Sequence, residues 1–170
     1  AQKSAPDVRV DRGENYELIK ILDGYYWPYD ISNNKEHVII QSLSAENGYY
    51  WSEATGSVSI SGSVYAVSEN GSVAGFYSNS NSSQKNVAGL WSPETQSWEF
   101  LGMNPDVPEF STDKDFLEYN GALSMTDDGS KVGIIQYFGW NEIETYIWTK
   151  EGGYEKLDNG VSPQTKPYAI

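Results

Sequence analysis

The stretch Tyr65–Tyr77, YAVSENGSVAGFY, decides the fold, because two short strand patterns in it flank a turn signal. β-Branched and aromatic residues mark both flanks, and this composition is typical of short strands. Between the flanks, Asn70-Gly71 is a strong hairpin signal, since both residues tolerate a positive φ at little cost. The stretch therefore predicts a strand, a tight turn and a second strand.

The same unit recurs twice elsewhere in the chain. Ser124–Gly133, SMTDDGSKVG, has Asp128-Gly129 at its turn. Asp30–Ile39, DISNNKEHVI, has Asn34-Lys35 where the other copies carry the turn glycine. A unit that recurs in this way indicates an array of β repeats.

A tryptophan strand pattern follows each hairpin, and one more strand pattern follows the tryptophan. The three tryptophans are Trp51, Trp91 and Trp148. Each repeat thus contains four strand patterns, which is typical of a β-propeller blade. We predict an all-β fold of four-stranded antiparallel blades, a partial β-propeller of about three blades, with the tryptophans filling the space between adjacent blades.

The repeats set the predicted domain organisation. Residues 1–13 are predicted to be a flexible lead-in, in which Val8 and Val10 favour a short edge strand. The rest, 14–170, is predicted to be one propeller fragment, with repeats at approximately 29–64, 65–121 and 122–165, and with 14–28 and 166–170 belonging to flanking blades.

Both ends of the chain resemble parts of a repeat. Tyr16–Ile21 has the pattern of a last strand, and Lys166–Ile170 has the pattern of a first strand. We therefore expect the chain to be a fragment of a longer one. Tyr16–Ile21 is placed to close a last blade, a closure that removes exposed sheet edges.

Composition excludes several classes of function. The net charge of −13 opposes binding to nucleic acid and to anionic membrane surfaces, and its ordinary role is solubility. The chain has no cysteine, which excludes disulfides and thiolate metal sites. No stretch approaches the roughly 20 apolar residues of a membrane helix, so no membrane insertion is expected.

Three segments of the second repeat resemble a known family. Ala66–Gly75 (AVSENGSVAG), Ala88–Ser92 (AGLWS) and Trp98–Gly102 (WEFLG) look like the HAF-type repeat of bacterial extracellular propeller-like proteins. The resemblance covers residues 28–160, and the first repeat departs from it by lacking the turn glycine. It implies propeller blades and an exported location, whether periplasmic, cell-surface or extracellular. It carries over no catalytic residue.

Three polar features of the sequence are candidates for catalysis or metal binding. His37, the only histidine, lies in a predicted strand at the position of Val73 and Lys131, which favours a structural role. Asp127-Asp128-Gly129 offers oxygen ligands for Ca²⁺, but these residues are also what a tight turn needs. The acidic group in the long insertion (Asp113, Asp115 and Glu118) favours a solvated loop. No catalytic residue, metal or cofactor is therefore assigned.

Exposed aromatic residues are the better functional signal. Tyr26 and Trp27 lie in a predicted connection, and Tyr137 and Trp140 lie at or after the second strand of the third repeat. These four are the predicted ligand-binding residues, because aromatic rings with nearby amides suit sugar or peptide recognition. The alternative is that they pack in the core or against the missing blades.

These features favour a non-enzymatic binding or scaffold module with a glycan or protein partner. The alternative is part of a propeller hydrolase or lyase that acts on polysaccharide in the central funnel. Acid and base residues that converge on the central strands would indicate the enzyme. A homo-oligomer through the open blade edges is a further expectation, because three blades do not close a ring.

Overall fold

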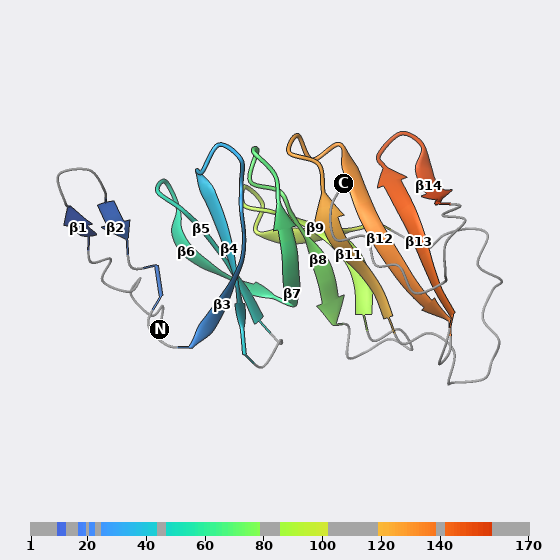
Figure 1. Cartoon of the computed structure of the whole chain (residues 1–170), viewed down its shortest axis with the longest axis horizontal. Helices are drawn as coiled ribbons and strands as arrows, with labels where there is room; N and C mark the ends of the chain where they lie inside the picture. The colour runs from blue at the N-terminus through green and yellow to red at the C-terminus, as the bar shows by residue number, and fades with distance from the viewer. Residues whose placement is uncertain are drawn as a thin grey trace.

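The computed structural model is all-β (Figure 1). It describes residues 10–12, 17–19, 21–22, 25–43, 47–78, 86–101, 119–138 and 142–157. For residues 10–12, 17–19, 78, 86, 119–120, 137–138 and 142–143 it describes the backbone alone. These ranges contain fourteen strands and no helix. They accordingly contain no helix long and apolar enough to cross a membrane.

Twelve of the strands form three four-stranded antiparallel sheets. Sheet 1 consists of β3 (Tyr26–Ile31), β4 (His37–Ser42), β5 (Asn47–Ser52) and β6 (Gly56–Ser61). Sheet 2 consists of β7 (Ser63–Val67), β8 (Val73–Ser78), β9 (Asn86–Ser92) and β10 (Ser97–Phe100). Sheet 3 consists of β11 (Tyr119–Met125), β12 (Lys131–Phe138), β13 (Glu142–Thr149) and β14 (Gly153–Lys156).

Each sheet is a meander, in which every strand pairs with the next strand along the chain. The predicted all-β fold of four-stranded antiparallel units is therefore confirmed. Sheet 1 already begins at Tyr26, so Tyr26–Pro28 pair with β4. These residues were predicted to belong to a flanking blade.

The remaining two strands form a hairpin near the N-terminus. β1 (Val10–Arg12) pairs antiparallel with β2 (Glu17–Ile19), and Figure 1 shows the pair beside sheet 1. A short strand was expected near Val10. The segment Tyr16–Ile21 was expected to close a last blade, whereas β2 pairs with β1 and with no other strand of the described chain.

The turn after the first strand is a three-residue loop in sheet 2. The Gly71 amide donates to the Ser68 carbonyl (3.0 Å), and the Ser68 amide donates to the Ser72 carbonyl (3.0 Å). Gly71 has φ +82°, and Asn70 is not among the residues with positive φ. Of the two residues that tolerate a positive φ, Gly71 adopts one and Asn70 does not. The Asn70 side chain accepts the Ser72 amide instead (3.0 Å).

The first repeat makes an equivalent turn without glycine. Lys35 takes the left-handed conformation there, with φ +63°. Gly129 has φ +74° in the third repeat. The left-handed region costs a residue with a Cβ roughly 1–2 kcal/mol, so Lys35 is the strained member of the three.

The three sheets stack face to face in chain order (Figure 1). β7 packs on β3, β4 and β5 of sheet 1, and β11 packs on β7, β8 and β9 of sheet 2. We call the face that looks toward the next sheet the forward face and the opposite one the rear face. Within the described residues, the row of sheets does not close into a ring.

The pairing register of the strands shows which residues are equivalent in the three sheets. Val38, Val73 and Val132 pair with the tryptophans of their sheets, Trp51, Trp91 and Trp148. Because cross-strand partners share a face, each such pair lies on the rear face of its sheet. Val73 therefore corresponds to Val38. The predicted correspondence of His37 with Val73 is wrong by one residue, because the first turn is longer.

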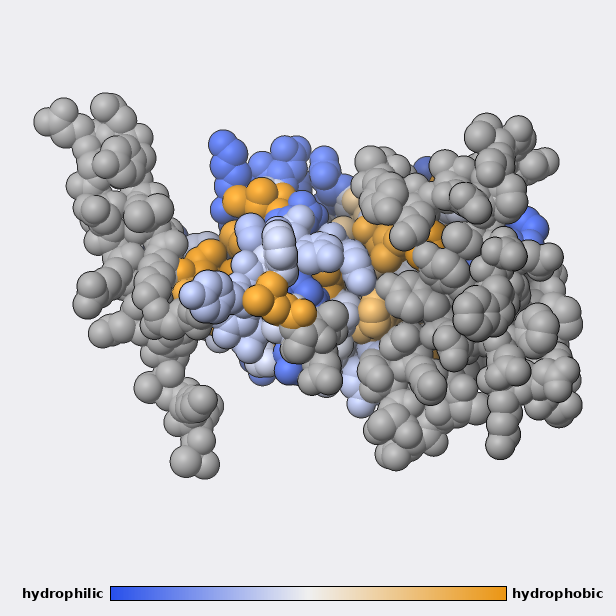
Figure 2. Space-filling view, turned by 60° about the horizontal axis from the view of Figure 1, so that its bottom comes forward, coloured by the Kyte–Doolittle hydropathy of each residue, from blue (hydrophilic) through white to orange (hydrophobic). Residues whose placement is uncertain are grey.

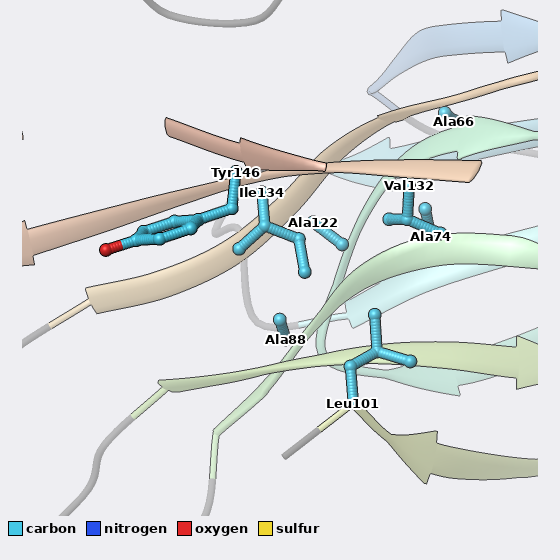
Figure 3. Close-up of a cluster of buried hydrophobic side chains, with 8 residues drawn as sticks. All are labelled: Ala66, Ala74, Ala88, Leu101, Ala122, Val132, Ile134 and Tyr146. Carbon is cyan, nitrogen blue, oxygen red and sulfur yellow. The ribbon is translucent and has the colours of Figure 1, made fainter. Parts of the chain in front are cut away.

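Two buried clusters fill the spaces between the sheets. The cluster between sheets 1 and 2 consists of Ile39, Tyr50, Ile60, Val64, Val67, Val73 and Trp91. The cluster between sheets 2 and 3 consists of Ala66, Ala74, Ala88, Leu101, Ala122, Val132, Ile134 and Tyr146 (Figure 3). Trp91 packs in the first cluster and Trp148 packs against the second, as predicted. Trp51 is also buried, but on the rear face of sheet 1.

Candidate functional site

A β-bulge lies at the same position in the first strand of every sheet. The register shifts between Pro28 and Asp30 in β3, between Val64 and Ala66 in β7, and between Ala122 and Ser124 in β11. The extra residues are Tyr29, Tyr65 and Leu123. A bulge re-aims the side chain of the extra residue and is common next to functional sites.

The first two bulges bring tyrosines from neighbouring sheets together. The ring centroids of Tyr29 and Tyr65 are 5.3 Å apart and the rings meet edge to face at 86°. Tyr65 lies 5.7 Å from Phe76 of β8, at 31°. Trp27, two residues before Tyr29, is 60% exposed, and Tyr29 is 47% exposed. We call Trp27, Tyr29, Tyr65 and Phe76 the aromatic row.

The aromatic row contains two exposed rings, Trp27 and Tyr29, and two half-buried ones. Tyr65 is half-buried and contacts Tyr29 from the side of sheet 2, and the half-buried Phe76 contacts Tyr65. Figure 2 shows that strongly apolar residues on the viewed face form separate orange spots among pale and blue ones. Exposed rings on a rigid strand are suited to contact a ligand with flat apolar surfaces.

The predicted site residues Tyr26 and Trp27 lie on opposite faces of sheet 1. Tyr26 pairs with Ser42, and its ring packs edge to face on Tyr49 at a centroid distance of 5.2 Å. Trp27 pairs with Gln41 and points to the opposite face of sheet 1, because successive strand residues alternate. Burial raises the pKa of Tyr49, and the hydrogen bond with Tyr26 raises it further. Tyr26 thus belongs to a packed pair, and Trp27 belongs to the aromatic row.

The other two predicted site residues lie at the edge of what the structure describes. The backbone of Tyr137 pairs with Tyr119 and Ile143 within sheet 3. The side chain of Tyr137 and all of Trp140 lie outside the described residues.

Sequence reasoning missed Tyr29 and Tyr65 as site residues. A signal for them was present, because Pro28-Tyr29-Asp30-Ile31 aligns with Val64-Tyr65-Ala66-Val67. The shared tyrosine marks the position of the bulge. The tyrosine side chain turns toward the neighbouring sheet because of the bulge. The alternation of apolar residues in the sequence does not reveal a bulge.

Two side chains of sheet 1 cover the free edge of β7. The Asp30 carboxylate accepts the Val67 amide through Oδ2 (2.9 Å) and the Ile31 amide through Oδ1 (2.9 Å). The Gln41 carbonyl oxygen accepts the Val64 amide (2.8 Å), and its side-chain nitrogen donates to Asn47 (3.0 Å). These bonds satisfy edge amides that would otherwise lose water on packing. The bonds of Asp30 and Gln41 also hold β7 of sheet 2 next to the aromatic row.

The three equivalent turns meet at one end of the stack. The side-chain amide of Asn34 donates to the Glu69 carbonyl (3.0 Å), and the Glu69 amide donates to the Asp127 carbonyl (2.7 Å). The side-chain amide of Asn33 reaches the Asp127 carboxylate at 3.4 Å. Each turn is therefore bonded to another, which holds the first strands in a fixed relation.

His37 takes part in this junction of turns. Its Nε2 lies 3.1 Å from the Glu69 carbonyl and its Nδ1 lies 2.7 Å from the Tyr50 hydroxyl. A carbonyl only accepts, so Nε2 carries the hydrogen and Nδ1 accepts from Tyr50. Burial raises the pKa of Tyr50, which keeps that hydroxyl protonated as a donor. Both ring nitrogens thus have structural partners.

The Asp127-Asp128-Gly129 segment builds its own turn. The Oδ1 atom of Asp128 accepts the Thr126 hydroxyl (2.6 Å), the Ser130 amide (2.9 Å) and the Ser130 hydroxyl (2.8 Å). These bonds, with the Thr126 hydroxyl contributing most, lower the pKa of Asp128 to about 2. Across the described residues, no three His, Asp or Glu side chains gather in a way that would hold a metal ion.

Comparisons with known proteins add no assignment to this site. No family model, curated protein or solved structure matches the chain.

Proposed function

We propose that this chain is a non-enzymatic binding module of an exported β-propeller-type repeat protein, and that the aromatic row binds a neutral glycan. The aromatic row is the observation that carries the proposal, because Trp27 and Tyr29 present open rings beside the fixed Tyr65. Rings stack on the apolar faces of sugars, and tyrosine hydroxyls bond to sugar hydroxyls.

Repeat geometry supports the propeller part of the proposal. Three successive four-stranded meanders stack in chain order, and their first strands carry bulges at one position. Blades of a propeller are meanders of this kind, with the first strand nearest the axis. The resemblance of Ala66–Gly75 to HAF-type repeats supports the exported location.

Charge favours a neutral glycan over an acidic one. The chain carries 24 acidic and 11 basic residues, so an anionic ligand is repelled over most of the surface. Along the row itself, Asp30 is the one carboxylate among the described side chains of the three first strands. Its oxygens are bonded to the amides of Ile31 and Val67.

The single carboxylate on the first strands, Asp30, also favours binding over hydrolysis. Glycoside hydrolysis needs an acid and a base on either side of the scissile bond. The described side chains of β3, β7 and β11 offer Asp30 without a second carboxylate. A binding surface needs neither group.

Affinity electrophoresis in gels that contain neutral polysaccharides tests the proposal. We expect at least one of cellulose, xylan, mannan or starch derivatives to retard the protein. Trp27→Ala and Tyr29→Ala are each expected to weaken retardation about tenfold, which corresponds to ~1.4 kcal/mol. Phe100→Ala is the matched control, because Phe100 is 50% exposed and lies on β10, the edge strand of sheet 2 opposite β7. Equal retardation of all variants, or none of the wild type, would contradict the proposal.

A further inference from the structure

A third exposed ring precedes the two open rings of the aromatic row. Tyr25 lies directly before β3 and is 87% exposed, whereas Trp27 is 60% exposed and Tyr29 is 47% exposed. The three rings thus occupy every second position of one short stretch of chain. We call Tyr25, Trp27 and Tyr29 the ring line.

The ring line lies on the side of sheet 1 that looks toward sheet 2. Trp27 pairs with Gln41, whose side chain accepts an amide of β7, and cross-strand partners share a face. The Tyr29 ring contacts the Tyr65 ring of β7. Tyr25 comes two residues before Trp27, and the alternation of an extended chain places it on the same side.

Strand pairing and a proline constrain the backbone that carries these rings. β3 pairs with β4, and Pro28 stands between Trp27 and Tyr29. A proline fixes its own φ and keeps the residue before it in an extended conformation. Because the rings are already in place, a ligand loses less binding free energy to ordering the site.

The ring line is longer than a single sugar. Strand residues rise about 3.3 Å each, so Tyr25 and Tyr29 lie roughly 13 Å apart along the chain. One pyranose ring is much shorter than this distance. Pyranoses joined by β-1,4 bonds form a straight chain that offers one flat face after another for stacking on aromatic rings, whereas α-1,4-linked chains coil.

The ring line also carries no charged side chain. Residues 25–29 read Tyr-Tyr-Trp-Pro-Tyr, in a chain where 21% of residues are charged. The next residue, Asp30, has its oxygens bonded to the amides of Ile31 and Val67. A neutral polymer can therefore cover the line without burying an unpaired charge.

We propose that the ring line binds an extended, neutral, β-1,4-linked glycan, with about three successive sugar units lying along β3. This inference rests on the proposed function, and it specifies the linkage and the length of the ligand. Tyr29, which contacts Tyr65, forms the inner end of the site, and the open Tyr25 forms its outer end. A long chain reaches from one end to the other, whereas a disaccharide does not.

Isothermal titration calorimetry with oligosaccharides of two and six units tests this inference. The probes are derived from cellulose, xylan and mannan, and maltohexaose is the coiled contrast. We expect a six-unit β-linked chain to bind about tenfold more tightly than its disaccharide and than maltohexaose. Equal affinity for both lengths, or for maltohexaose, would overturn the inference and leave the neutral-glycan function in place. Binding of no glycan at all would contradict the proposed function itself.

Tyr25→Ala tests the outer end of the site. The variant should bind the six-unit chain about tenfold more weakly and the disaccharide with unchanged affinity. Tyr25→Phe keeps the ring and should bind both ligands as the wild type does, and Phe100→Ala is the control away from the line. Tyr25 is 87% exposed, so these variants should keep the melting temperature. Unchanged binding of the six-unit chain by Tyr25→Ala would overturn the inference.

Discussion

Between sheets 1 and 2 the buried cluster contains no alanine, whereas between sheets 2 and 3 four of its eight members are alanines, namely Ala66, Ala74, Ala88 and Ala122. Equivalent positions of the two forward faces hold Ile39 and Gln41 in sheet 1 but Ala74 and Phe76 in sheet 2. Asp30 of sheet 1 bonds the edge of β7, and its counterpart in sheet 2 is Ala66. One repeat thus supports two interface chemistries, because the meander fixes which positions face a neighbour and leaves their residues free to vary.

Exchanging residues between equivalent positions of the two interfaces tests this difference in packing. Ile39→Ala places the residue of sheet 2 into the first interface, where Ile39 is completely buried. We expect a loss of about 2–5 kcal/mol in the free energy of unfolding, from lost burial and the cavity left behind. Urea unfolding followed by tryptophan fluorescence measures it. A loss below about 1 kcal/mol would show that the first interface can collapse around the smaller residue.

The reverse exchange, Ala74→Ile, overfills the second interface. Ala74 is completely buried and lies next to Val132 in the second cluster (Figure 3), so added methylenes have no free space. We expect a loss of about 1–3 kcal/mol in the same measurement. Leu90→Ile, a volume-conserving change at the edge of that cluster, serves as the control. Equal stability of Ala74→Ile and the wild type would contradict close packing there.

Gln41→Leu removes the polar clamp on β7 but keeps much of the side-chain volume. The Val64 amide then loses its acceptor in a buried position, which costs about 1–3 kcal/mol. Amide hydrogen exchange followed by NMR should show faster exchange at Val64 than in the wild type. The amide of Ala74 in the neighbouring strand pair serves as the internal reference. Unchanged protection at Val64 would mean that the clamp does not hold that edge.

Lys35→Gly sharpens the comparison of the three turns. Lys35 has φ +63° where the other copies have glycine. Release of left-handed strain outweighs the extra freedom of glycine in the unfolded chain, so we expect stability to rise by up to about 1 kcal/mol. Thermal unfolding measures the gain, and Lys35→Ala, which keeps the Cβ, is the control. A destabilised Lys35→Gly variant would contradict the turn geometry.

The smallest effect is a pH dependence that belongs to the third turn. The folded-state pKa of Asp128 is lowered to about 2, so its contribution to stability is complete above its unfolded pKa near 3.8 and fades as pH falls toward 2. Asn34 and Asn70 occupy the same position in the other turns. Asp128→Asn should therefore fold and lose this part of the acid dependence, as acid titration of both proteins would show. Identical acid profiles would contradict the role of the carboxylate.

The sequence predicted those features that depend on local pattern. The turns at Asn70-Gly71 and Asp128-Gly129 and the tryptophan strands depend on short-range chemistry. The first strands of the three sheets begin two or three residues before the predicted repeats, at Tyr26, Ser63 and Tyr119. Strand alternation also places Tyr26 and Trp27, two of the four predicted ligand-binding residues, on opposite faces. That separation follows from a period of two and was within reach of sequence analysis.

Other features depend on residues that are distant along the chain. The contact of Tyr29 with Tyr65 requires a bulge in each strand and the stacking of two sheets, and neither has a clear mark in one sequence. The bond from Asp30 to Val67 crosses 37 positions of the chain. The pairing of β2 with β1, in place of a closing strand, depends on long-range competition between sheet edges that local propensity does not resolve.

The central claim is that equivalent sheets stack so that their bulges build the aromatic row. The most direct test is a nuclear Overhauser measurement between the rings of Tyr29 and Tyr65 in the folded protein, with Tyr29→Phe and Tyr65→Phe to assign the signals. The account predicts a strong cross-peak, because the ring centroids are 5.3 Å apart. Absence of this cross-peak, in a spectrum where the Tyr26 and Tyr49 rings do show theirs, would contradict the stacking of sheet 2 on sheet 1.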